Sequence, residues 1–241
     1  MIVCIPTKGR AETNTYQLFE KAGFTVYHFI EPQEYDEYDV PNKINIKQND
    51  MGISYVRNFM LSWCKQKKLK WSWFCDDDIL HFGRFNGKTT KTDANELWEV
   101  YEIAKKLPFE MVGIGTRAFS WTAKKNISIN SNFVEGCVML HVEKINWKYR
   151  DNTKEDRDFC LQCIAKGHGI IRFNKIFYDT PVVGSNKGGL NEWYNSKLDY
   201  EASKKLVLTW SPWIKLKQKK TRLDIKADLS GFAKSCMRKV I

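Results

Sequence analysis

The chain has 241 residues, of which 43% are hydrophobic and 14% aromatic, and its formal net charge at pH 7 is +11. These values predict a folded α/β domain, alone or with a small appendage, and argue against global disorder. No apolar run approaches the ~18 residues that a membrane helix needs. The first residues, MIVCIPTKGR, predict a first strand and not a signal peptide.

The helices and strands follow from apolar spacing, taken in chain order. Apolar runs predict strands at residues 2–6, 25–30, 43–47, 69–75, 111–115, 133–142 and 170–178. Helical spacing predicts helices at residues 12–22, 53–67, 94–106, 155–166 and 200–209. Residues 86–92, NGKTTKT, predict a mobile loop. Strand–helix alternation of this kind predicts a mainly parallel sheet with helices on both faces.

The positive charge is concentrated at the end of the chain. Residues 211–241 contain nine Lys/Arg and two Asp, which gives +7 of the +11, and four more lysines lie between Lys65 and Lys70. A basic balance of this kind favours a polyanionic partner, either nucleic acid or an anionic membrane surface. Ordinary solubility charge is the alternative.

The seven cysteines are odd in number and lie mostly within apolar stretches. Only Cys160 and Cys163 form a C-x-x-C pair, and no second pair completes a zinc site. Both fall in a helix-like pattern, so we interpret them as reduced core thiols. The pattern favours a reducing, cytoplasmic compartment.

Three polar loops are predicted to meet at one edge of the sheet. The basic loop 7–10 follows the first predicted strand, residues 49–54 follow the third, and Asp76–Asp78 follow the fourth. Ligands of open α/β sheets bind at the carboxyl ends of the strands. Aspartates also favour solvated turns. Because hard divalent cations bind clustered carboxylates, the convergence favours a metal-bound diphosphate.

Four motifs, in this order, resemble the glycosyltransferases of the GT-A fold. They are IPTKGR at the start, GISYVRN at residues 52–58, the triple Asp, and KEDRDF at residues 154–159. The resemblance covers about residues 1–180. Within the GT-A class, the sequence is similar to the TET/JBP-associated glycosyltransferases of phage DNA and base J synthesis. It implies an α/β, Rossmann-like GT-A domain over residues 1–200, with a mixed, mainly parallel sheet. Residues 201–241 then form a basic C-terminal extension.

The resemblance also implies an activity and its cofactor. A sugar passes from a nucleotide-sugar, with a UDP-sugar favoured, to the hydroxymethyl group of a modified pyrimidine in DNA. Asp78 is expected to hold Mn²⁺ or Mg²⁺, which neutralises the leaving diphosphate. Asp76 and Asp77 are expected to face the ribose and the waters of the metal.

Further donor contacts, Gly52 among them, are expected from the loops that follow the first and third predicted strands. Arg57 lies on the helix opened by Gly52, and its guanidinium is expected to contact phosphate or the aspartates. A surface helix charge is the alternative for Arg57. Thr7 and Arg10 are expected to border the base or the ribose.

A second acidic group, Glu155 and Asp156, begins a predicted helix. Such residues commonly complement the helix dipole, which is the alternative interpretation. The resemblance implies that Asp156 is the general base of an inverting transferase, accepting the proton of the acceptor hydroxyl. Glu155 is the substitute candidate.

Two further features are predicted beyond this helix. The glycine-rich loop 184–189 offers backbone amides to phosphate, with Lys187 and Gly188 as expected donor contacts and without Walker spacing. A third metal ligand is expected at Asp179, at the end of a strand, in preference to His168.

The basic tail is the predicted nucleic-acid segment. Its lysines would neutralise phosphates and its tryptophans would stack on bases, one of which must leave the duplex to react. Ile214 and Leu216 alternate with lysines, which suits a strand better than a helix lying on a membrane. A solvated hairpin is the alternative. The predicted contacts are Trp213, Lys215, Lys217, Lys219, Lys220 and Arg222.

Two other classes of function compete with DNA modification. One is a GT-A transferase that builds a surface glycan and attaches peripherally to a membrane through its basic tail. The other is a binding module without catalysis, against which the two acidic groups argue. A phage-encoded DNA-modifying enzyme would act in the host cytoplasm, and neither its donor nor its pyrimidine is specified by the sequence.

Overall fold

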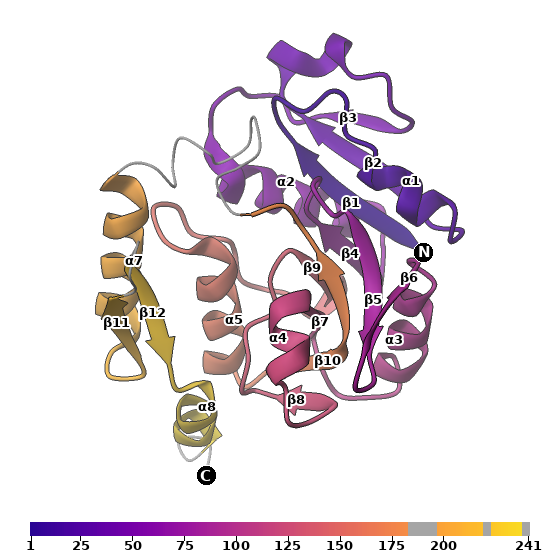
Figure 1. The fold of residues 1–241 in the computed structure, drawn as a ribbon. Coiled ribbons are helices and arrows are strands. Elements are labelled where there is room, and N and C mark those ends of the chain that lie inside the picture. Colours follow the sequence, from indigo (N-terminus) through magenta and orange to yellow (C-terminus); the bar gives the residue numbers. More distant parts are fainter. Residues whose placement is uncertain (183–196, 219–222, 238–241) are drawn as a thin grey trace.

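The computed structural model describes residues 1–182, 197–218 and 223–237, and Figure 1 shows their arrangement. Ten strands of this described part form one sheet, nine of them in the order β3-β2-β1-β4-β9-β7-β10-β5-β6, with β8 paired to β10. The mixed α/β sheet expected from the sequence is confirmed.

The first half of the sheet is parallel throughout. Its strands are β1 (Ile2–Thr7), β2 (Thr25–Ile30), β3 (Lys43–Asn45) and β4 (Trp71–Cys75). The connections contain α1 (Thr15–Glu20), the 3-10 helix η1 (Pro32–Glu37) and α2 (Gly52–Gln66). Parallel neighbours require such crossovers, because the chain must return to the same edge before each new strand.

The second half mixes directions. Strand β9 (Cys137–His141) runs antiparallel to both β4 and β7 (Met111–Thr116), and β10 (Ile170–Asp179) runs parallel to β7. The carboxyl ends of β1, β4, β7 and β10 therefore meet at the edge where β9 begins. Antiparallel partners of β10 or of its neighbour complete the sheet: β5 (His81–Phe85), β6 (Thr89–Thr92) and β8 (Ile127–Ile129).

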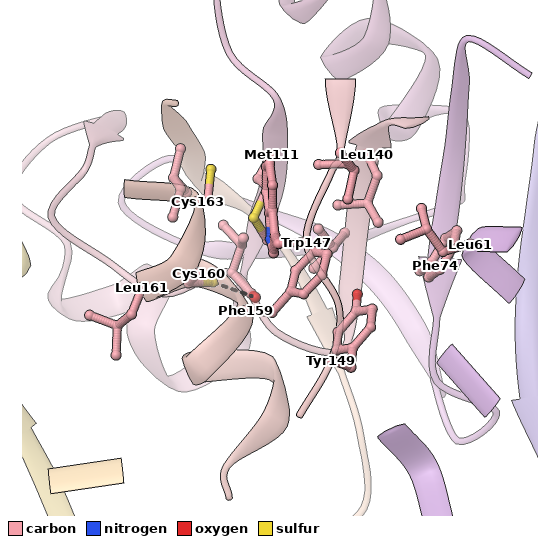
Figure 2. Close-up of a cluster of buried hydrophobic side chains, with 14 of the residues drawn as sticks. Leu61, Phe74, Met111, Leu140, Trp147, Tyr149, Phe159, Cys160, Leu161 and Cys163 are labelled. Atoms are coloured by element: carbon pink, nitrogen blue, oxygen red, sulfur yellow. Dashed lines mark hydrogen bonds between the residues drawn. The ribbon is translucent and has the colours of Figure 1, made fainter. Parts of the chain in front are cut away.

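Helices cover both faces, because alternate strand residues point to opposite sides. Cys4 and Phe74 belong to one apolar cluster with residues of α2 and of α5 (Glu155–Ala165). Val3 and Trp73 belong to the other, with residues of α1 and of α3 (Glu96–Ala104). Figure 2 shows part of the first cluster, where Phe159 of α5 packs among side chains of the sheet and of the preceding loop.

The described C-terminal residues pack beside α5. They form α7 (Lys197–Trp210), the hairpin β11 (Ile214–Gln218) and β12 (Leu223–Ala227), and α8 (Leu229–Met237). Leu206, Ile214 and Phe232 are buried in the same cluster as α5. Helix α7 begins before residue 200, so the division predicted there falls inside a helix. No helix in the described part of the chain has the length and apolar character needed to cross a bilayer.

Several element predictions need correction. Residues 86–92 contain strand β6, which pairs with β5 in a hairpin, rather than only a loop. The expected helix at residues 12–22 is confined to Thr15–Glu20, because Gly23 adopts φ +79° just after it. The short helix α4 (Arg117–Thr122) and β8 were not predicted at all. With six and three residues, both are too short to give a clear period.

Candidate active site

The site lies at the edge where the parallel strands end. Asp76, Asp77 and Asp78 follow β4, the basic loop 7–10 follows β1, and Asp179 ends β10. The backbone N–H of Asp76 donates to the carbonyl of Gly136, just before β9 (2.8 Å). These loops converge as expected from the position of ligands in α/β sheets.

Asp77 is the most enclosed of the three aspartates, with 6% of the residue exposed. Thr7 Oγ1 donates to Asp77 Oδ2 (2.7 Å), and the Arg10 guanidinium pairs with Asp77 Oδ1. The hydroxyls of Thr13 and Thr15 donate to the Asp77 carbonyl, the latter at 2.7 Å. Burial raises the pKa of Asp77 against the opposing effect of Arg10. Asp77 thus ties the loop after β4 to the loop after β1.

Arg57 joins the two acidic groups. Its Nη2 lies 3.0 Å from Asp76 Oδ1 and its Nη1 2.8 Å from Glu155 Oε1. Only 11% of the Arg57 side chain is exposed, and its guanidinium lies 5.7 Å from the centre of the Tyr149 ring. Although burial disfavours the charged form, Glu155 and Asp76 raise the pKa of Arg57. Arg57 therefore contacts Asp76, one of the three aspartates expected as its partners.

Helix α2 also positions the loop that faces Arg57. Asn58 Nδ2 donates to the carbonyl of Tyr149 (2.8 Å), and the Tyr149 N–H donates to Asn58 Oδ1 (2.9 Å). The Tyr149 ring stacks on Phe159 with 3.8 Å between centroids. The position of the Tyr149 ring beside Arg57 is therefore fixed by contacts with Asn58 of α2 and with Phe159 of α5.

A small pocket opens among these residues. Its lining includes Arg57, Asp76, Glu135, Tyr149 and Asp156, and about 20 Å³ of it is open to the centre of a water molecule. That is room for about one water. Burial raises the pKa of both Asp76 and Glu155 to about 7, and the charge of Asp156 adds to the shift at each. Asp76 nevertheless keeps 40% of its side chain exposed.

Asp156 faces this pocket from the first turn of α5. Its Oδ1 accepts the backbone N–H of Arg157 (2.7 Å). The Arg157 side chain lies between two other carboxylates, 2.7 Å from Glu135 and 3.1 Å from Asp224 of β12. Burial raises the pKa of Glu135, with Asp156 contributing and Arg157 opposing. Acidic residues of four segments therefore share two arginines.

Asp78 and Asp179 lie at the same edge but have different neighbours. Asp78 Oδ2 is 3.5 Å from Arg10 Nη1, and 25% of its side chain is exposed. Asp179 Oδ2 is 3.0 Å from Arg117 Nη1 and 3.7 Å from His81 Nε2. Among the described residues, no group of three or more His, Cys, Asp or Glu is arranged to hold a metal ion.

The comparison with protein families decides the class. A model of the TET-associated glycosyltransferases matches residues 1–189. The chain belongs to this family. The family and the glycosyltransferase activity expected from the motifs are thus confirmed. No curated protein gives a significant match.

Several solved structures match this TET-associated glycosyltransferase at low identity, and the first of those described below supports a shared fold. Glucosyl-3-phosphoglycerate synthase from Mycobacterium tuberculosis, solved with Mn²⁺, UDP and phosphoglyceric acid, is 9% identical with a TM-score of 0.51, over 94% of this chain and 85% of that one. CMP:2-keto-3-deoxy-manno-octonic acid synthetase complexed with CTP is 8% identical (TM-score 0.48; 80% and 95% covered). A197 from STIV is 12% identical (TM-score 0.43; 75% and 85% covered).

The remaining predicted site residues fall in three places. Gly52 opens α2 with φ +78°, a conformation that a larger residue adopts only with strain. His168, the candidate for the third metal ligand that is less favoured than Asp179, stacks on the buried Trp147 and has its Nδ1 3.5 Å from Glu110 Oε1. Five predicted contacts of this TET-associated glycosyltransferase lie outside the described residues: Lys187, Gly188, Lys219, Lys220 and Arg222.

The described part of the predicted nucleic-acid segment is the hairpin β11–β12. Lys215 and Lys217 are exposed on β11, and Ile214, which precedes Lys215, is buried. Trp213 is half-buried, with its ring 6.2 Å from that of Phe232 of α8. The ring of Trp213 thus contributes to the packing of the C-terminal elements.

Sequence reasoning missed several residues of the site. Glu135 and Tyr149 line the pocket, and each lies in a segment with no motif of its own. Arg157 borders the pocket and lies within the KEDRDF motif, but nothing in the sequence separates it from a surface charge of the helix. Gly136 offered one signal. It adopts φ +63°, and a Cβ there would clash with the Tyr178 hydroxyl and lie 3.1 Å from Asp76 Oδ2. A glycine beside a strand start indicates close approach of this kind.

Proposed function

We propose that this enzyme transfers a sugar from a nucleotide-sugar to the hydroxymethyl group of a modified pyrimidine in DNA, with inversion and with Mn²⁺ or Mg²⁺. The observation that carries the proposal is the meeting of two acidic groups on Arg57, at the carboxyl edge of a glycosyltransferase sheet. Family membership supports sugar transfer.

The donor and the cation fit the residues after β4. Asp78 and Asp76 present partly exposed carboxylates, and two carboxylates with diphosphate oxygens are a common Mg²⁺ environment. When bound, the cation would neutralise charge on the diphosphate as it leaves. The structural neighbour of the same fold binds Mn²⁺ and UDP, which supports the same donor class here. Asp179 stays the proposed third ligand.

The chain's own residues supply the other parts of the reaction. The acceptor hydroxyl oxygen bonds to the anomeric carbon, the bond from that carbon to the diphosphate oxygen breaks, and the hydroxyl proton passes to Asp156. Asp156 is preferred to Glu155, because Glu155 is engaged by Arg57 at 2.8 Å. Arg57 holds in place Asp76, which is proposed to lie on the donor side, and Glu155, which is next to the proposed base.

DNA as the acceptor is supported by the family and by charge. The net charge of +11 favours a polyanion, and Lys215 and Lys217 expose two of these charges on β11. All seven cysteines are free, as suits an enzyme acting on DNA in a reducing cytoplasm.

A donor screen tests the proposal. The purified chain is incubated with UDP-sugars and other nucleotide-sugars, Mn²⁺ or Mg²⁺, and duplex DNA containing hydroxymethylcytosine or hydroxymethyluracil. Nucleoside mass spectrometry should show a hexose or pentose added to the modified base only. Unmodified DNA is the matched control. Transfer to lipid-linked or polysaccharide acceptors, with none to DNA, would favour the surface-glycan alternative.

A further inference from the structure

The short helix α4 presents large aromatic side chains to solvent. Phe119 is 57% exposed and Trp121 is 51% exposed, and Ile129 on the neighbouring strand β8 is 54% exposed. Figure 1 shows α4 lying over β10, away from the C-terminal hairpin. An exposed apolar patch that is rimmed by polar residues marks an interaction site. We call the patch formed by residues 117–129 and the β5–β6 hairpin (residues 81–92) the α4 surface.

The aromatic side chains of the α4 surface are held in place. Trp121 Nε1 donates to Thr89 Oγ1 of β6 (3.0 Å), and the Arg117 guanidinium lies 5.5 Å from the centre of the Trp121 ring. Lys175 Nζ donates to the carbonyl of Ala123 at the end of α4 (2.7 Å). A fixed ring loses little entropy when a ligand stacks on it.

The charge of the α4 surface has one sign. Its two segments contain no Asp or Glu. Among the described residues, none of its four lysines forms an ion pair with a carboxylate. A surface that combines unpaired lysines with exposed aromatic rings suits a strand of nucleic acid. Two of its six cations are paired with carboxylates of neighbouring elements, Arg84 with Glu96 and Glu99 of α3 and Arg117 with Asp179. The other four are Lys88, Lys91, Lys124 and Lys125.

The α4 surface begins at the edge that carries the site. Helix α4 follows β7 directly, and Arg117 in its first turn pairs with Asp179. On the other side, the backbone N–H of Leu80, two residues after Asp78, donates to the carbonyl of Asp179 (2.8 Å). Strand β5 also begins at this edge, where His81 Nε2 lies 3.7 Å from Asp179 Oδ2. A polyanion lying on the α4 surface would therefore reach the acidic groups.

We propose that the α4 surface binds the DNA acceptor, with phosphates on its lysines and an exposed base stacked on Trp121 or Phe119. The proposal rests on the proposed function and names a second binding surface beside the basic hairpin. The positive charge of the α4 surface favours a polyanion over a neutral or basic partner. The exposed aromatic rings favour DNA over a simple phosphate.

Fluorescence anisotropy with a labelled hydroxymethylcytosine duplex, over a salt titration, tests the α4 surface on the full chain. K124E/K125E should weaken binding and reduce the slope of log affinity against log salt by about two. W121A should weaken binding by about 5- to 150-fold at a single salt concentration, with the slope unchanged. W121F should recover most of this loss. Hydrolysis of the donor without DNA should match the wild type in all three variants.

The matched control carries the same charge change on the hairpin, K215E/K217E. If this control loses DNA affinity and the α4 variants bind like the wild type, the α4 surface is not the acceptor site. An altered sedimentation of W121A, with normal DNA affinity, would identify the surface as a contact between copies and also overturn the proposal. If the wild type transfers no sugar to any hydroxymethylated DNA, the proposed function itself fails, whatever the variants bind.

Discussion

The site contains two acidic groups, Asp76–Asp78 after β4 and the residues Glu155, Asp156 and Asp158 in the first turn of α5, and their members have corresponding surroundings. Asp77 after β4 and Asp158 in α5 are both enclosed, with 7% and 1% of their side chains exposed. Asp77 is held by Thr7 and Arg10, and Asp158 accepts from Arg150 (2.7 Å) and Trp210 (2.8 Å).

The other members of the two groups also correspond. Asp76 and Glu155 share Arg57, which cancels part of their charge. Asp78 lies near Arg10 (3.5 Å) and not near Arg57, and in the described part of the chain Asp156 forms no ion pair with Arg57. The comparison teaches that one carboxylate of each group anchors the loop or helix, one orients Arg57, and one carries the proposed chemistry.

The largest effect is expected at Asp78. Asp78→Asn keeps the size of the side chain but removes a negative charge from the proposed cation site, so sugar transfer should fall by about a thousandfold or more. The thermal unfolding midpoint should stay near that of the wild type, because the side chain is partly exposed. Turnover would be measured at saturating donor over a Mn²⁺ titration. Wild-type turnover at all Mn²⁺ concentrations would remove Asp78 from the cation site.

Asp156→Asn should have the next largest effect. A general base acts mainly in the transition state, so turnover should fall by about 10²–10⁴-fold while donor affinity stays nearly constant. Calorimetric titration of the donor, beside single-turnover transfer, separates the two quantities. Glu155→Gln is the matched variant. If Glu155→Gln loses turnover and Asp156→Asn does not, the base is Glu155 and not Asp156.

Much of this comparison was predictable from sequence, because a strand end fixes where the next residues lie. The run WSWFC predicts a buried strand, and its end places Asp76 at the ligand edge. The partition among Asp76, Asp77 and Asp78 was not predictable. It depends on Thr7, Arg10 and Arg57, whose contacts with the aspartates span 19 to 70 residues along the chain. The antiparallel direction of β9 was also not predictable, because an apolar run does not show which way a strand runs in the sheet.

The pH dependence of stability should expose the buried position of Glu155. Burial raises its pKa from 4.5 to about 7 in the folded enzyme. Between these values the folded state binds the proton more tightly than the unfolded state, so stability is greater at the acidic end and falls as pH rises from about 4.5 to about 7. Melting curves over this range should show a fall of a few degrees from this group.

The control for this prediction is Glu155→Gln, which removes the titrating group but keeps its size. Its melting temperature should change less with pH over the same window than that of the wild type. A wild-type midpoint that rises steadily with pH, by the same amount as in the variant, would show that Glu155 is ionised at its ordinary pKa.

The smallest expected effects distinguish the two anchoring carboxylates. Asp77→Asn and Asp158→Asn are isosteric, and each weakens charge-assisted hydrogen bonds, so each should cost about 1–3 kcal/mol of unfolding free energy. Their kinetic consequences should differ. Asp77 holds Arg10 in the loop proposed to border the donor, so Asp77→Asn should raise KM for the nucleotide-sugar several-fold with kcat little changed. Asp158 holds Arg150 and Trp210, away from the donor loop, and Asp158→Asn should leave both constants near wild type. Denaturant titration and steady-state kinetics on the same samples give both results. Equal changes in KM would show that the two anchors differ only in position, and the donor loop would then owe nothing specific to Asp77.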